Sequence, residues 1–434
     1  MTFPRHRHSV SEPRYDDEDL KMFPITTKQQ HALDIENQFA ASDLSATMMN
    51  EKHPEANPIP REGLTLRQRL KHFTFAWYAC TMSTGGVAFT LSVIPNRFPG
   101  LTQIGLGLFV INVILFITFT TLMIARFIIH PGTLRHAFLN PHEGFFSATF
   151  WLTLATMMSN STAYILPHAG SWLPVVLRYS FWTYTALVTA HAIFYYNILF
   201  THHKLVITNV LPGWVLPIFP PMLVGTLASA IARSQPPQQA LTILVAGLSY
   251  QGLGMMIAIF MYSLYFGRLL TCGLPVDMSR PAMFIAVGPP SFTALAFIGM
   301  AQSVTQADIF QTDIGLDGID SALIAPILLL LALIAAIFLW MLSFWFFAIA
   351  LLATIEAIPR NDFHLNWYAY VFPNVGFTIA TIKIGERLMA PAILGVGIGM
   401  ASVIFVLWVL IVACHIKAFI NKQICWPGKD EDAH

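Results

Sequence analysis

The sequence predicts an all-α integral membrane protein with ten transmembrane segments. Of its 434 residues, 55% are hydrophobic and only 11% are charged, whereas soluble domains carry about 25% charged residues. From residue 72 onward, apolar runs recur between short polar connections. A bilayer core of about 30 Å requires roughly 20 apolar residues per helix. These runs have that length, at about 72–95, 104–129, 146–167, 172–200, 212–233, 239–270, 282–304, 319–355, 366–385 and 390–420.

The region before the first segment differs in composition. Residues 1–63 are polar, and no apolar run follows a basic start, so the sequence does not predict a signal peptide. We expect a disordered cytoplasmic tail over 1–63, a transmembrane domain over 64–421 and a short cytoplasmic tail over 422–434.

Lysine and arginine in the connections predict the orientation. One side holds Arg67, Arg69, Lys71, Arg126, Arg135, Lys204, Arg268, Arg280, Arg360, Lys417 and Lys422. The other side holds Arg97, Arg233, Lys383 and Arg387, together with the acidic stretch "ADIFQTDIGLDGID". Both termini are therefore expected in the cytoplasm.

Helix-breaking residues fall in the odd-numbered segments, in "STGG", "SNST", "LPIFPPMLVG", "VGPPS" and "FPNVG". The positions singled out are Gly85, Gly86, Pro220, Pro221, Gly288, Pro289, Pro290, Pro373 and Gly376. Proline removes a backbone hydrogen bond, and broken backbone at membrane depth is tolerated only against protein or a water-filled cavity. Five interrupted segments in alternation therefore predict five inner helices around a polar path, with the even segments facing lipid. Glycine and proline in single helices also serve close packing.

The path is expected to suit an anion. No Asp or Glu lies in the middle of a segment, whereas cation transporters usually place a carboxylate there. Hydroxyl and amide groups lie at mid-depth instead, among them Ser159 and Thr226. Arg280 can bind a carboxylate or anchor a helix start, and Lys383 can contact the ligand or extend to the headgroups. Gln251 can face the path or a neighbouring helix.

Other classes of function find little support in the sequence. The four cysteines are scattered without metal-ligand spacing, so neither a metal site nor a cofactor is expected. No HExxH motif, GxSxG motif or intramembrane aspartate pair occurs, which argues against a membrane-embedded enzyme. A net charge of +1, without a basic run that contains aromatic residues, argues against nucleic acid.

Several stretches together resemble one family. They are "LRQRLKHFTFAWYACTMSTGGVAF", "WVLPIFPPMLVG", "YQGLG", "RPAMFIAVGPPSF", "WYAYVFPNVGFTIATIKIG" and "CWPGKDEDAH". From about residue 64 to the C-terminus, the chain is similar to the fungal malic acid transport proteins. These belong to the tellurite-resistance and dicarboxylate transporter family, which also includes the plant slow anion channels.

The resemblance implies five helical hairpins whose odd helices line a central pore in each protomer of a homotrimer. It implies transport of malate, succinate and related C4-dicarboxylates across the plasma membrane, or alternatively conduction of small inorganic anions. Phe372 matches the phenylalanine that plugs the pore in relatives, and Phe377 is the second candidate for this gate. Arg280 is the first expected carboxylate contact, and Gln251, Ser83, Thr84, Ser291 and Asn374 are expected to donate neutral hydrogen bonds. Coupling to protons and the direction of transport stay open.

Overall fold

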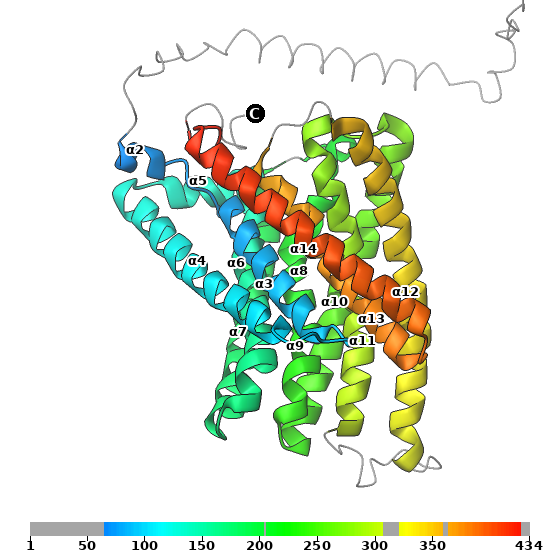
Figure 1. The fold of residues 1–434 in the computed structure, drawn as a ribbon. Helices are drawn as coiled ribbons and strands as arrows, with labels where there is room; N and C mark the ends of the chain where they lie inside the picture. The colour runs from blue at the N-terminus through cyan, green and yellow to red at the C-terminus, as the bar shows by residue number, and fades with distance from the viewer. Residues whose placement is uncertain (1–64, 204, 307–320, 359–362, 427–434) are drawn as a thin grey trace, which may run out of the picture. The chain divides into compact units, whose positions relative to one another are not determined.

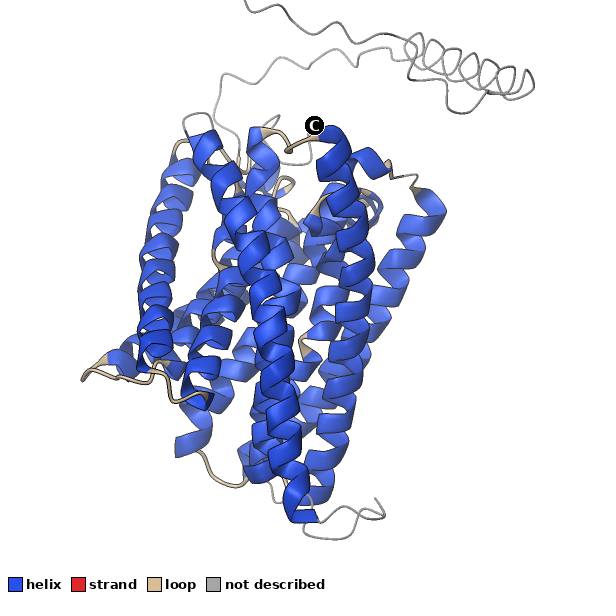
Figure 2. Cartoon of the chain, turned by 90° about the vertical axis from the view of Figure 1, so that its right-hand side faces the viewer, coloured by secondary structure: helices blue, strands red, loops and turns tan. Residues whose placement is uncertain are grey.

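A computed structural model describes residues 65–203, 205–306, 321–358 and 363–426. Within these ranges the chain consists of helices and short connections, with no strand (Figure 2). The tail predicted over 1–63 and all but the first five residues of the tail predicted over 422–434 lie outside the described residues. The all-α prediction is therefore confirmed for the part of the chain that carries the apolar runs.

Five long single helices coincide with the even-numbered predicted segments. They are α4 (Leu101–Ile129), α7 (Trp172–His202), α10 (Pro237–Cys272), α12 (Ser321–Ala357) and α14 (Pro391–Ile420). Their sequences are apolar along most of their length, because lipid-exposed side chains need no polar partner. Many of their large apolar side chains are exposed, including Phe260, Phe338 and Val403.

The odd-numbered segments are composite helices. Four of them begin with a 3₁₀ helix and continue as an α-helix: η1 (Phe75–Trp77) with α3 (Tyr78–Val93), η5 (Pro212–Ile218) with α8 (Phe219–Met222) and α9 (Val224–Ile231), η7 (Asp277–Val287) with α11 (Gly288–Gln306), and η9 (Leu365–Tyr370) with α13 (Phe372–Arg387). The third segment instead starts as α6 (Pro141–Asn160) and ends in the π-helix η2 (Ser161–Ile165) and the 3₁₀ helix η3 (Leu166–His168). Short elements complete the chain: α2 (Leu66–Leu70), α5 (Thr133–Leu139), η4 (Ile207–Asn209) and η6 (Ala232–Ser234).

The prolines of these segments mark junctions between helix types. Pro220 and Pro221 lie in the first turn of α8, Pro289 and Pro290 in that of α11, and Pro373 in that of α13. In a first turn the backbone N–H has no acceptor within the helix, so proline costs little there. The chain thus changes direction without leaving buried N–H groups unsatisfied.

The glycines predicted as breaks behave differently. The sequence predicts that these residues break a helix or shape the pore. Gly85 and Gly86 lie inside the continuous helix α3, and Gly376 lies inside α13, so the backbone is helical at all three positions. A Cβ atom on Gly85 would lie 2.3 Å from Thr156 Oγ1 of α6. These glycines therefore allow neighbouring helices to approach closely, as small residues commonly do in membrane proteins.

Burial separates two classes of helix. Among the described residues, six stretches are long and apolar enough to cross a membrane, and each predicted segment contains helical structure. In each stretch we compare the share of the most apolar 18 residues that is buried. This share is 89% for Pro212–Ser234 and 94% for Asp277–Gln306. The corresponding share is 28% for Leu101–Ile129, 39% for Pro237–Cys272, 11% for Ala322–Ala357 and 22% for Pro391–Ile420. Apolarity alone does not distinguish the buried stretches from the exposed ones. Their position in the fold does.

The composite segments pack against one another in a closed sequence. Helix α3 contacts α6, α6 contacts η5, α8 and α9, α9 contacts α11, α11 contacts α13, and α13 returns to α3. We call this arrangement the five-segment ring. The long helices pack on it from outside: α4 on α3, α10 on α9, α12 on α11 and α14 on α13 (Figure 1). Cys425 Sγ donates to Arg69 O, so both ends of the described chain meet at one end of the bundle. We call this end of the bundle the terminal end.

A buried ion pair connects the second segment to the third near the terminal end. Arg126 of α4 and Glu143 in the first turn of α6 form a two-point contact, in which Arg126 Nη2 donates to Glu143 Oε2 at 3.1 Å. Arg126 is 4% exposed and Glu143 is 1% exposed. A guanidinium and a carboxylate can be buried in this way only because each satisfies the other.

Glu143→Gln should destabilise the protein. The substitution leaves the Arg126 charge buried without its counter-charge, and breaking a buried pair in this way costs about 3–5 kcal/mol. Thermal unfolding of the purified protein in detergent would measure the effect. The control is the double variant Arg126→Met/Glu143→Leu, which should lose less stability than Glu143→Gln because no lone charge remains. Equal losses in both variants would contradict the assigned role of the pair.

Candidate functional site

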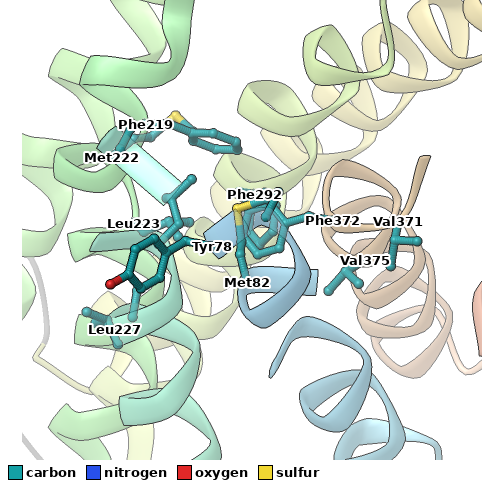
Figure 3. Packing of buried hydrophobic residues seen from close by; sticks show 14 of the residues in the cluster. Tyr78, Met82, Phe219, Met222, Leu223, Leu227, Phe292, Val371, Phe372 and Val375 are labelled. Carbon is teal, nitrogen blue, oxygen red and sulfur yellow. The ribbon is translucent and has the colours of Figure 1, made fainter. Parts of the chain in front are cut away.

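Three phenylalanine rings meet at the centre of the five-segment ring. They belong to Phe219 at the start of α8, Phe292 of α11 and Phe372 at the start of α13. The Phe292 and Phe372 rings are stacked with centroids 5.2 Å apart, and Phe219 meets them edge-on at 5.6 and 6.0 Å (Figure 3). Such distances are typical of attractive aromatic contacts. We call these residues the phenylalanine cluster.

A glycine of a neighbouring segment supports each ring of the cluster. A Cβ atom would lie 2.6 Å from Phe219 Cζ if added to Gly288, and 2.7 Å from Phe292 Cδ2 if added to Gly376. On Gly86 it would lie 3.2 Å from Phe372 Cδ2. The rings thus rest directly on backbone, and even a methyl group at Gly288 or Gly376 would displace them.

A cavity of about 20 Å³ lies on the terminal side of the phenylalanine cluster. Its walls come from all five composite segments and are mostly apolar: Ala79, Met82, Phe146, Thr149, Leu152, Leu216, Phe219, Ile285, Leu365, Asn366, Ala369, Phe372 and Pro373. We call it the terminal-side cavity.

A second cavity, of about 50 Å³, lies on the opposite side of the cluster. The same five segments line it, each with residues further along the chain: Gly86, Phe89, Ala155, Thr156, Ser159, Leu223, Thr226, Ser229, Phe292, Leu295, Phe372 and Val375. We call it the far-side cavity. Phe372 lines both cavities, so its ring lies between them.

The far-side cavity carries four hydroxyl groups and, among the described residues that line it, no charge. Each hydroxyl donates to a carbonyl of its own helix: Thr156 to Thr153, Ser159 to Ala155, Thr226 to Leu223 and Ser229 to Thr226, at 2.7 to 3.0 Å. A hydroxyl can rotate from such a bond to donate to a ligand. The cavity therefore offers neutral, adaptable hydrogen-bonding groups.

Helix starts add electrostatic character to the cluster. The α-helical part of the seventh segment begins at Gly288 and that of the ninth at Phe372, so both begin at the level of the phenylalanine rings. The N-terminus of an α-helix carries a partial positive charge, because its peptide dipoles are aligned along the axis. Two such ends favour negative charge near the rings.

The predicted hydroxyl contacts Ser83 and Thr84 lie behind the cavity walls. Ser83 Oγ donates to Tyr368 O at 3.3 Å, and Thr84 accepts a hydrogen bond from Trp408 Nε1 of α14 at 3.1 Å. Both residues are fully buried, and neither lines a cavity. In the structure they therefore connect segments to one another.

The predicted amide and hydroxyl contacts Gln251, Ser291 and Asn374 are also buried. Gln251 of α10 donates from Nε2 to Thr293 Oγ1 at 2.7 Å, and Asn374 donates from Nδ2 to Tyr370 O at 2.9 Å. Ser291 donates to Gly288 O at 2.9 Å, beside the phenylalanine cluster. Gln251 Oε1 and Asn374 Oδ1 have no hydrogen-bond partner in the structure. None of the three lines either cavity.

The two predicted cationic contacts are occupied by the protein's own oxygen atoms. Arg280 pairs with Asp277 at 3.0 Å and with Glu356 at 3.3 Å, and it donates to Ala353 O at 2.7 Å. Lys383 pairs with Glu386 at 2.8 Å. Neither side chain lines a cavity, so the structure does not bring these cations to the phenylalanine cluster.

The two gate candidates lie on different faces of α13. Phe372 belongs to the phenylalanine cluster and is 1% exposed. Phe377 packs against Trp340 and Phe347 of α12, with centroid distances of 5.4 and 5.7 Å. Only Phe372 lies between the cavities.

Sequence reasoning missed Phe219, Phe292 and Ser229 as residues of this site. Phe219 directly precedes Pro220, just as Phe372 directly precedes Pro373. This repeated Phe-Pro junction was the available signal for Phe219, whereas nothing in the sequence distinguishes Phe292 from other buried aromatics.

Comparison with known proteins places the chain among anion-transport proteins. The family model described as "voltage-dependent anion channel" matches residues 72–416. A malic acid transport protein of Schizosaccharomyces pombe is 34% identical over 374 residues, which cover 85% of this chain and 83% of that protein. A second protein of that yeast, also named for malic acid transport, is 33% identical, with 85% of each chain covered. A sulfite efflux pump of Trichophyton rubrum is 26% identical over 82% of this chain and 93% of its own length.

Gly288→Ala should displace the Phe219 ring and destabilise the protein by about 1–3 kcal/mol, as overpacking typically does. The control is Gly252→Ala on α10, where an added Cβ meets nothing within 4 Å, and which should be neutral or stabilising. Thermal unfolding in detergent would compare the two variants. Gly288→Ala/Phe219→Leu should recover part of the loss; unchanged stability in Gly288→Ala would contradict the tight contact.

Proposed function

The chain belongs to the voltage-dependent anion channel family, and on that premise we propose that it carries small organic anions across a membrane through the five-segment ring. The observation that carries the proposal is the pair of cavities on either side of the phenylalanine cluster. Both are walled by the same five segments, and one side chain, Phe372, separates them. This is the arrangement expected of a closed pathway with one narrow point.

An anion would be stabilised along this pathway without a fixed cation at its centre. The starts of α11 and α13 each favour a negative charge by about 0.3–1 kcal/mol, and the hydroxyls of Ser159, Thr226 and Ser229 can rotate to donate. Weak and distributed stabilisation of this kind suits conduction, because binding must allow the ion to leave.

Phe372 is the proposed gate. Its ring closes the connection between the cavities, and rotation about its side-chain bonds would open it without movement of a helix. Voltage then drives the anion, at about 2.3 kcal/mol per charge per 100 mV. Pro373 fixes the backbone next to the gate, since its ring restricts φ.

The proposed arrangement in the membrane follows from charge. Ten segments would cross it as five hairpins, and the terminal end would be cytoplasmic because most lysines and arginines of the connections lie there. The resemblance stated above supports a homotrimer in the plasma membrane with one pathway per protomer, surrounded by lipid. The exposed apolar faces of the long helices suit both lipid and neighbouring protomers.

C4-dicarboxylates such as malate and succinate are the proposed substrates, because the relatives with the highest identities reported above are named for malic acid transport. A small inorganic anion such as sulfite is the second candidate. It is favoured by the sulfite efflux relative and by the modest volumes of the two cavities, about 20 and 50 Å³.

Phe372→Ala should increase malate current in voltage-clamped cells. Removing the ring joins the two cavities, and a barrier lowered by about 1.4 kcal/mol would raise the current about tenfold. Phe377→Ala is the matched control, because it removes the same side chain from the face of the same helix that packs on α12. It should leave the current per protein at the cell surface unchanged.

The two substrate classes are separated by repeating the recording with malate, succinate and sulfite in turn. Larger wild-type currents for malate and succinate support dicarboxylate transport, whereas a current with sulfite alone supports the second candidate. Equal changes in Phe372→Ala and Phe377→Ala would overturn the assignment of the gate. Uptake of labelled malate that follows the proton gradient without current would indicate electroneutral transport.

A further inference from the structure

A second set of polar groups lies beyond the far-side cavity, at the end of the five-segment ring opposite the terminal end. Arg233 of η6 follows Ser229 by one helical turn on the fifth segment, and Ser229 lines the cavity. Arg233 Nε donates to Ser303 Oγ and Arg233 Nη2 donates to Gln302 Oε1, both at 3.3 Å. Both acceptors belong to α11. The guanidinium is thus held between the fifth and seventh segments, next to the cavity.

The connection to the cavity is direct. Ser303 is fully buried, and its hydroxyl contacts Ser229 O at 2.8 Å. Each step from the cavity wall to the guanidinium is therefore a hydrogen-bond contact: Ser229 to Ser303, and Ser303 to Arg233. An anion that leaves the cavity in this direction meets Arg233 next.

Arg233 keeps hydrogen-bonding capacity for a ligand. It forms no ion pair with any residue that the structure describes, in contrast to Arg280 and Lys383. A guanidinium has five N–H donors, and the protein uses two of them here. Gln302 is 7% exposed, and its Nε2 is buried with no hydrogen-bond partner in the structure. An unpaired buried donor is costly unless a ligand or water satisfies it.

Arg387 adds a second guanidinium. It ends α13 and lies close enough to Arg233 for their charges to interact. Glu386, a described acidic residue of this end whose charge also acts on Arg233, is paired with Lys383 at 2.8 Å. Two arginines held near each other repel, and a bound anion would relieve that repulsion. Fixed positive charge at the mouth of a pathway also raises the local concentration of anions.

We propose that Arg233, Gln302 and Arg387 form a binding site for a carboxylate-bearing anion at the far mouth of the pathway. Arg233 and the Gln302 amide contact the carboxylate, and Arg387 contributes charge. This inference deepens the proposed function, because it assigns the site at which the transported anion first binds from the far side. It also gives a role to two arginines that have no carboxylate partner among the described residues.

The test varies the concentration of malate on the far side and measures inward transport. In the proposed orientation the far side is extracellular. Arg233→Gln should raise the malate concentration that gives half-maximal inward transport by about tenfold, which is the loss expected for one charged hydrogen bond. The matched control is Arg97→Gln. Arg97 is another cation assigned to the same side, but its Nη1 donates to Ser92 O, and Ser92 does not line the far-side cavity. Its removal should shift the concentration less than twofold.

Two further variants keep the proposal testable if Arg233→Gln is poorly expressed. Arg233→Lys retains the charge and loses the planar fork, so its shift should be intermediate. Arg387→Gln removes an exposed side chain and should raise the half-maximal concentration severalfold. Equal shifts in Arg97→Gln and Arg233→Gln would reduce the effect to general surface charge and overturn the site, as would an unchanged value in Arg233→Gln.

Thermal stabilisation of the purified protein by malate separates this inference from the proposed function. Suppose that malate stabilises the wild type and not Arg233→Gln, but that the wild type does not transport malate. This result would support the site and refute malate transport. Malate transport with the same half-maximal concentration in wild type and Arg233→Gln would refute the site and leave the proposed function intact.

Discussion

The close approach of aromatic rings to glycine backbone is the contact on which the five-segment ring depends. Phe372 of α13 rests on Gly86 of α3, Phe219 of α8 on Gly288 of α11, and Phe292 of α11 on Gly376 of α13. Each contact therefore joins two different segments. The same three contacts link the fifth, seventh, ninth and first segments to one another and hold the phenylalanine cluster at the level between the cavities. A lipid environment offers no hydrophobic drive for helix association, so close packing of this kind carries much of it.

The prolines act together with these contacts. Because proline is tolerated in a first helical turn, α8, α11 and α13 can each begin in the middle of the bundle rather than at its surface. Helix starts and aromatic rings thus come to the same level, so that the narrow point of the ring is also where backbone dipoles favour an anion. The composite character of these segments is therefore what supplies polarity without a charged side chain.

The sequence predicts depth along a helix better than rotation about its axis. Segment positions follow from apolar length, and the alternation of interrupted and continuous segments distinguishes the buried helices from the exposed ones. Rotation is different: Phe377 follows Phe372 by five residues, about 140° around an α-helix, and accordingly faces α12 instead of the cluster. Arg280 was at a plausible depth, but Glu356, one of its partners, is 76 residues away in sequence. Only the fold brings that carboxylate close and leaves Arg280 occupied.

Neighbouring acidic residues determine which cations of the ring are occupied within the described part of the chain. On the terminal side, Asp277 and Glu356 neutralise Arg280, and at the far end Glu386 neutralises Lys383. Arg233 and Arg387 have no such partner in the described part of the chain, while Arg126 in the second segment is neutralised by Glu143. Both arginines are exposed, so a negative charge that comes from outside the chain can reach them. A pathway with a neutral centre and two exposed arginines at its far mouth attracts an anion without retaining it in the middle, because the positive charge lies where the anion is still hydrated.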